Sequence, residues 1–112
     1  MRQAVPPAWL AISTVTVMEI EYGFECQPTA FKRYATLWNV LQTDLQVLPY
    51  ESLDAVQTGR VRAHLASLGT LIGPFDLQLA GTALARGLTL VTHNTGEFGR
   101  VPNLVLEDWW LS

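Results

Sequence analysis

The sequence predicts an α/β fold in which a mostly parallel central sheet is flanked by helices. Short apolar segments rich in β-branched residues alternate along the chain with segments of helical periodicity. One of them, Leu88–Thr92, is almost wholly apolar, which is typical of a parallel strand covered on both faces. The length of 112 residues and the hydrophobic content of 49% indicate a single domain over residues 1–112 with a substantial core.

The first half of the chain predicts two strands and two helices. Leu10–Thr16 is rich in β-branched residues and is expected to be a strand, followed by a short helix over Val17–Glu25. Thr29 is expected to cap the next helix. Leu45–Leu48 is expected to be a short strand. Apolar side chains recur three and four residues apart in the second helix: Phe31, Tyr34, Leu37, Trp38 and Leu41.

A long helix over Ser52–Leu68 is expected next, with Gly69 as its C-terminal stop. The turn Gly73-Pro74 then begins a further helix that Arg86 and Gly87 close. Five apolar side chains of the first of these helices are expected to face the core: Leu53, Val56, Val61, Leu65 and Leu68.

The last third of the chain alternates strand, loop and strand. Leu88–Thr92 is the expected strand, and residues 93–98 have loop character. Leu104–Leu106 is expected to be a last short strand. Trp109 and Trp110 are expected to cover an end of the core or to join an interface.

Four polar side chains fall at or after predicted strand ends, where ligands bind in open parallel sheets. Glu19 follows the first strand, Asp76 begins the helix that leads to Leu88–Thr92, and Asn94 and Glu97 follow that strand. Carboxylates gathered in one cleft need a compensating cation, and oxygen ligands favour Mg²⁺ or Mn²⁺. Such an ion activates water and neutralises a phosphodiester.

Structural roles compete with this interpretation. Asp76 as a helix cap would contribute about 1 kcal/mol. Glu19 could be a solvated residue of a first helical turn, and Asn94 and Glu97 could stabilise a turn. From the residues alone, the metal site and these structural roles both stay open.

The remaining reactive side chains carry weaker signals. His64 and His93 have no partner pattern of a zinc site, and Cys26 has no nucleophile signature, so it is expected to be a buried or half-buried structural thiol. A single cysteine favours a reducing compartment, the cytoplasm. No apolar stretch reaches about 18 residues, so no membrane span is expected. The net charge of −3 argues against a broad electropositive nucleic-acid platform but is compatible with an acidic metal-dependent nuclease site.

Three segments, in order, resemble the PIN-domain toxins of VapC type. They are Ile12–Gly23, Ile72–Phe98 and the ending Val101–Leu104 with Glu107–Trp109. The second segment contains the run Gly73-Pro74-Phe75-Asp76 and the run Val91-Thr92-His93-Asn94. The resemblance covers nearly the whole chain.

The resemblance implies a PIN fold and an endoribonuclease that depends on Mg²⁺ or Mn²⁺. It also implies a small VapB-type antitoxin as partner, and a homodimer. Glu19 and Asp76 match the acidic positions that hold the ion. The last acidic position of the family is Asn94 here, with Glu97 as a nearby acidic substitute.

The chain departs from the family at its start. VapC-type chains begin with a strand ending in Asp-Thr-Asn, which supplies the first metal-binding aspartate, so the chain is expected to be an N-terminally truncated PIN-like domain. Three explanations stay open. The true start of the protein could lie upstream of Met1, or a second chain could donate the missing strand by swapping or from a split gene. Alternatively, the chain could be a degenerate remnant that folds around the gap and no longer cleaves RNA.

The sequence therefore predicts a VapC-type ribonuclease that hydrolyses RNA phosphodiesters, with Asp76 and Glu19 as metal ligands and Asn94 or Glu97 completing the set. Arg86 and Arg100 are candidates for phosphate contacts. The alternative is a catalytically silent PIN-like binding module that docks an antitoxin or partner chain.

Overall fold

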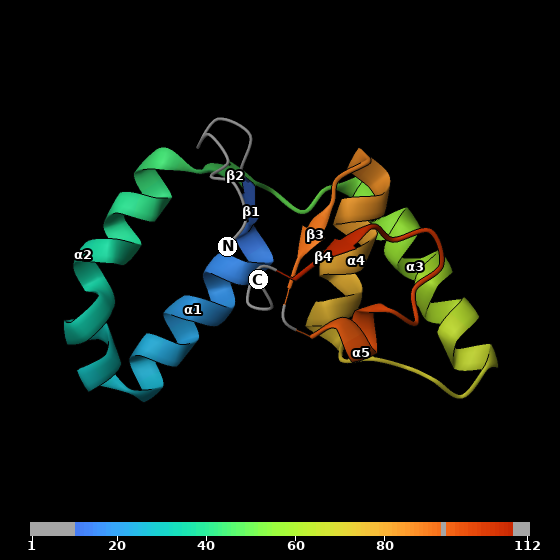
Figure 1. The fold of residues 1–112 in the computed structure, drawn as a ribbon, viewed down its shortest axis with the longest axis horizontal. Helices are drawn as coiled ribbons and strands as arrows, with labels where there is room; N and C mark the ends of the chain where they lie inside the picture. The colour runs from blue at the N-terminus through green and yellow to red at the C-terminus, as the bar shows by residue number, and fades with distance from the viewer. Residues whose placement is uncertain (1–10, 93, 109–112) are drawn as a thin grey trace. The chain divides into compact units, whose positions relative to one another are not determined.

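The structure, a computed structural model, describes residues 11–92 and 94–108 and forms two compact units. The N-terminal unit ends at Pro49 and the C-terminal unit begins at Tyr50. Each unit combines helices with one pair of parallel strands (Figure 1). The predicted α/β class with parallel strands flanked by helices is confirmed. Leu10, His93, Trp109 and Trp110, for which predictions were made, lie outside the described residues.

In the N-terminal unit, two helices connect two parallel strands. Strands β1 and β2 pair from Ala11 opposite Gln46 to Ser13 opposite Leu48. The helices α1 and α2 contact each other (Figure 1). The elements are β1 (Ala11–Ser13), α1 (Thr14–Cys26), α2 (Pro28–Asp44) and β2 (Gln46–Leu48).

Both helices of this unit begin earlier than the sequence indicated. The Ser13 hydroxyl accepts a hydrogen bond from the backbone N–H of Val15 at 3.1 Å and caps α1. The expected strand Leu10–Thr16 was therefore wrong from Thr14 onward, because a serine cap outweighs the strand preference of the following β-branched residues. Helix α2 begins at Pro28 rather than after a Thr29 cap, since the first helical position needs no N–H donor.

Trp38 connects the two helices. It is the buried side chain of α2, and its indole N–H donates to Glu21 Oε1 at 2.7 Å. The Phe24 ring packs edge-on against the Trp38 ring, with centroids 6.5 Å apart. The other apolar side chains of the periodic pattern in α2 are exposed: Phe31, Tyr34, Leu37 and Leu41.

The described residues of the C-terminal unit form three helices and a second parallel strand pair. Leu90 of β3 lies opposite Leu106 of β4, and the Leu90 N–H donates to the Val105 carbonyl at 2.9 Å. Helices α3 and α4 lie side by side (Figure 1). The elements are α3 (Ser52–Ser67), α4 (Pro74–Arg86), β3 (Leu90–Val91), α5 (Thr95–Phe98) and β4 (Leu106–Glu107).

The predicted boundaries of helices α3 and α4 are confirmed to within one residue. Gly69 and Gly87 have φ of +68° and +64°, the left-handed conformation that ends a helix. The strands differ from the predicted ones. Strand β3 is shorter than the expected Leu88–Thr92, and β4 overlaps the expected Leu104–Leu106 only at Leu106. The expected loop over residues 93–98 contains the short helix α5, capped by Asn94.

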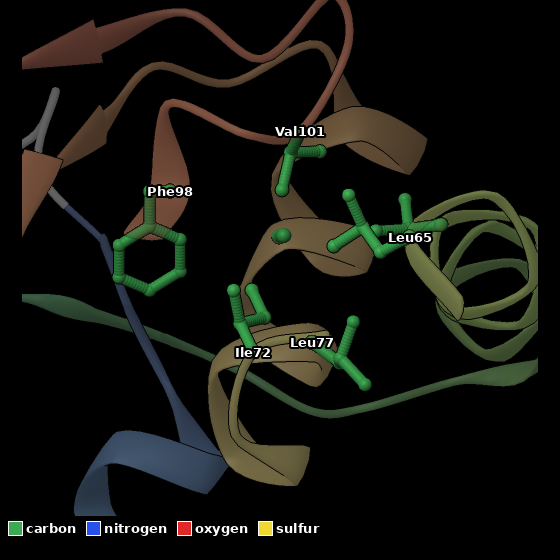
Figure 2. Close-up of a cluster of buried hydrophobic side chains, with 7 residues drawn as sticks. Leu65, Ile72, Leu77, Phe98 and Val101 are labelled. Carbon is green, nitrogen blue, oxygen red and sulfur yellow. The ribbon is translucent and has the colours of Figure 1, made fainter. Parts of the chain in front are cut away.

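The core of the C-terminal unit joins α3, α4, α5 and the loop after α5. Figure 2 shows the side chains of Leu65, Ile72, Leu77, Phe98 and Val101 converging on one another. Leu65 is fully buried, and Phe98 is 3% exposed. The buried cluster consists of Val61, Leu65, Ile72, Leu77, Ala80, Phe98 and Val101.

The prediction for the core face of α3 was correct in part. Val61 and Leu65 are buried, but Leu53, Val56 and Leu68 are 73%, 48% and 61% exposed. The buried carboxylate of Asp54 occupies the N-terminal half of α3 instead, where it forms an ion pair with the partly exposed Arg86 of α4. Within residues 11–92 and 94–108, no helix is long and apolar enough to cross a membrane.

Candidate functional site

Asp76 is the third residue of α4, and its carboxyl group turns back toward the start of the helix. Gly73 is the N-cap, and its carbonyl accepts the first helical bond from the Leu77 N–H at 2.9 Å. A Cβ added at Gly73 would lie 3.8 Å from Asp76 Oδ2. Asp76 is half-buried and is not the capping residue, so the interpretation of this carboxylate as a helix cap was wrong.

Glu97 of α5 meets the Asp76 carboxyl group. The charge of Glu97 and a hydrogen bond from it raise the pKa of Asp76, so the two carboxyl groups lie near each other although they are 21 positions apart in sequence. Asn94 sets the local geometry, because its Oδ1 accepts the backbone N–H of Glu97 at 3.5 Å and caps α5. Thr92 Oγ1 in turn accepts the Asn94 N–H at 3.0 Å. The C-terminal unit therefore brings together three of the four predicted site residues.

The electrostatics of the pair favour a bound cation. Partial burial raises the pKa of the Asp76 carboxyl group, and the charge of Glu97 and its hydrogen bond raise it further. Two carboxyl groups in contact cannot both ionise without cost, and a cation between them removes that cost. The donors are carboxylate oxygens with an amide oxygen nearby, which are ligands suited to Mg²⁺ or Mn²⁺. The chemistry of this donor set thus fits such an ion.

Glu19 belongs to the N-terminal unit and is exposed on α1. Its assignment as a metal ligand stays a prediction. Among the described residues, no group of three or more His, Cys, Asp or Glu side chains could hold a metal ion.

The other candidates of the sequence have the following environments. Cys26 is exposed at the end of α1, so the expectation of a buried or half-buried thiol was wrong. His64 is exposed in the last turn of α3. Arg86 donates from Nε and Nη2 to the two carboxylate oxygens of Asp54 at 3.2 and 2.9 Å, which gives it a structural role, and its assignment to a phosphate contact stays a prediction.

Asp54 is a residue that the sequence interpretation missed. It is 1% exposed, and its Oδ2 also accepts the backbone N–H of Glu51 at 2.8 Å. The Arg86 hydrogen bonds lower the pKa of the Asp54 carboxyl group, outweighing the effect of its burial. The spacing of Glu51 and Asp54 is that of a capping box, the one sequence signal for a structural acid at this position.

Known proteins are similar to this chain in fold and in sequence. Residues 4–104 match the PIN domain family. A tRNA(fMet)-specific endonuclease VapC of Salmonella typhimurium is 41% identical over 100 residues, which span 89% of this chain and 75% of that protein. The protein of the same description from Shigella flexneri is 43% identical, with the same shares covered. A crystal structure of DNA-bound VapBC from Salmonella typhimurium superposes with a TM-score of 0.81 at 42% identity, covering 88% of this chain and 74% of that chain.

The fold is that of a PIN domain. More narrowly, the chain belongs to the VapC family of PIN-domain ribonucleases, the toxins of VapBC toxin–antitoxin systems. The resemblance drawn from the sequence is thus confirmed.

Proposed function

We propose that this chain is a metal-dependent endoribonuclease in which Asp76 and Glu97 bind Mg²⁺ or Mn²⁺. The contact between these two carboxyl groups is the observation that carries the proposal. When bound, the ion supplies a Lewis acid that activates water and neutralises phosphodiester charge. Glu19 stays the predicted further ligand from α1.

The residues of the chain have distinct tasks in this proposal. Asp76 is held at the start of α4, where helix N–H groups face a carboxylate favourably. Glu97 brings the second charge, and the Asn94 amide fixes the start of α5 and thereby the position of Glu97. Burial and the Glu97 carboxyl group raise the pKa of Asp76, and a cation held by the two carboxyl groups would lower that pKa again.

The proposed substrate is tRNA(fMet). Two relatives that share 41% and 43% identity with this chain are tRNA(fMet)-specific endonucleases. Purified protein is incubated with end-labelled tRNA(fMet) or elongator tRNA(Met), in Mg²⁺, in Mn²⁺ or in chelator, and the products are resolved on sequencing gels.

Cleavage that needs the metal and favours tRNA(fMet) is the expected result. Equal cleavage of both tRNAs would refute the proposed specificity for tRNA(fMet) but would leave the proposed ribonuclease activity intact. A chain that cuts neither RNA with either metal, and that shows no metal site by calorimetry, would instead be the catalytically silent binding module.

The proposed partner is a VapB-type antitoxin, with a homodimer of this chain as the other assembly. The related VapBC structure contains both proteins and DNA. Four apolar side chains of α2 remain exposed and offer contact area to a partner: Phe31, Tyr34, Leu37 and Leu41. Added antitoxin is expected to stop the cleavage assay, and light scattering is expected to show a dimer and a toxin–antitoxin complex. A monomeric protein whose RNA cleavage is unchanged by added antitoxin would contradict the proposed partner and the proposed homodimer.

A further inference from the structure

The chain contains few cations, and the described ones have different environments. The net charge is −3, so an RNA backbone gains little from the protein as a whole. Arg86 is engaged by Asp54, and Arg60 and Arg62 are exposed along α3. Arg100 lies two positions after the end of α5, the helix that carries Glu97.

The same core fixes Arg100 and the acidic pair. Asp76 directly precedes the buried Leu77, Glu97 precedes the buried Phe98, and Arg100 precedes the buried Val101. Figure 2 shows the side chains of these three apolar neighbours in one cluster. Because each polar position is next to an anchor in that cluster, the backbone that carries Arg100 is as firmly placed as the backbone of the two acids.

Two further contacts fix the position of Arg100. Its backbone N–H donates to the Glu97 carbonyl at 3.1 Å, which closes the turn after α5. Its Nη1 donates to the Leu71 carbonyl at 3.3 Å, in the segment that leads into α4. The side chain thus joins the two segments that carry Glu97 and Asp76.

The guanidinium group keeps donors for a ligand. Arg100 is exposed, and within the described residues no carboxylate forms a salt bridge with it. A guanidinium has five N–H donors, of which the Leu71 carbonyl uses one. Arginine presents the others in a planar fork that fits two phosphate oxygens.

We propose that Arg100 contacts an RNA phosphate next to the scissile bond and positions the backbone against the acidic pair. This inference rests on the proposed ribonuclease function. The sequence alone did not distinguish Arg86 from Arg100 as phosphate-binding candidates. In the structure, Arg86 forms an ion pair with Asp54, whereas Arg100 is exposed to solvent and its backbone N–H bonds to the Glu97 carbonyl.

The test compares Arg100→Gln and Arg100→Lys with the control Arg62→Gln, an exposed arginine on α3. Cleavage kinetics in Mg²⁺ are measured on tRNA(fMet) over a range of KCl concentrations, and thermal melting is recorded for every variant. In parallel, fluorescence anisotropy in chelator measures binding of the same RNA without cleavage.

Arg100→Gln is expected to raise KM about tenfold, the loss of one charge-assisted hydrogen bond, with kcat much less affected. The slope of log affinity against log salt should fall by about one, as for the loss of one phosphate contact. Arg100→Lys should restore the slope but not the full affinity, and Arg62→Gln should match the wild type.

Three outcomes would overturn the proposal. In the first, Arg100→Gln melts at a lower temperature while the slope of log affinity against log salt is unchanged. Arg100 would then serve only the fold, through its hydrogen bond to the Leu71 carbonyl. In the second, Arg62→Gln changes KM and slope as much as Arg100→Gln, which means a diffuse charge effect. In the third, wild type and Arg100→Gln bind RNA identically in chelator. Absence of cleavage with a changed binding slope would refute the proposed nuclease but keep the phosphate contact.

Discussion

Gly81→Ala is expected to destabilise the protein by about 2 kcal/mol or more, because the close contact of α4 with α3 leaves no room for a methyl group. A Cβ at this position would overlap Thr58 Oγ1 and would lie 2.8 Å from the Thr58 backbone nitrogen and 2.9 Å from the Asp54 carbonyl oxygen. Two of these three atoms are backbone, so they move only if the helices separate. The midpoint of thermal unfolding should fall by about 8 °C or more.

Gly59→Ala is the matched control, since Gly59 lies in α3 and a Cβ there meets nothing within 4 Å. This substitution should stabilise the protein by about 0.5–1 kcal/mol, because alanine loses less backbone entropy in a helix. Circular dichroism melts of both variants decide the point. Equal stability of Gly81→Ala and Gly59→Ala would show that the two helices are not in the close contact described.

Asp54→Asn is expected to cost about 2 kcal/mol at neutral pH, because it removes hydrogen bonds between a buried carboxylate and a guanidinium. Asp54 is 1% exposed and accepts from Arg86 at 3.2 and 2.9 Å. The asparagine amide would also place one of its own N–H groups toward the Arg86 donors.

The pH dependence of this loss follows from the pKa of the Asp54 carboxyl group, which Arg86 lowers from its ordinary value of 3.8. The folded protein then binds the proton less tightly than the unfolded chain. The stabilisation is complete above the unfolded pKa and is lost as the pH falls through the folded one. Urea unfolding should therefore give a constant difference between wild type and Asp54→Asn near neutral pH, and a shrinking difference at acid pH. A difference that grows on acidification would contradict the ion pair.

The sequence predicted helices α3 and α4 well because both end at glycines with left-handed backbone. Gly69 and Gly87 have positive φ, and Gly73-Pro74 begins α4, so three local signals coincide with the observed boundaries. Such signals act within a few residues and need no tertiary contact.

Predictions that depended on burial were weaker. Leu53 and Phe31 match the helical periodicity but are 73% and 47% exposed. Periodicity gives the face of a helix, but the element that covers this face is a tertiary property. The exposure of Cys26 has the same origin, because a residue type predicts average burial rather than a position at a helix end.

The candidate site could be predicted in composition but not in geometry. Asp76 was named from its position at the start of a helix, and Asn94 and Glu97 from their positions after a strand. The proximity of Asp76 and Glu97 supports that choice. Their contact depends on the packing of Leu77 and Phe98 in one core, which no spacing rule gives. Asp54 was missed because nothing local predicts that its partner is Arg86, 32 residues later.

The central claim is that Asp76 and Glu97 hold the ion on which RNA cleavage depends. It is tested most directly by the rate of tRNA(fMet) cleavage as a function of Mn²⁺ concentration for the wild type and Asp76→Asn. Asp44→Asn, at the exposed end of α2, is the control for the loss of one negative charge. Burial and Glu97 raise the pKa of Asp76, so its charge is unfavourable in the metal-free fold, and the asparagine variant should stay folded.

The wild type and Asp44→Asn should show a rate that rises with Mn²⁺ and saturates. Asp76→Asn should stay at the rate measured in chelator at every Mn²⁺ concentration while melting within a few degrees of the wild type. A folded Asp76→Asn protein that cleaves tRNA(fMet) at the wild-type rate, with the wild-type dependence on Mn²⁺, would contradict the account.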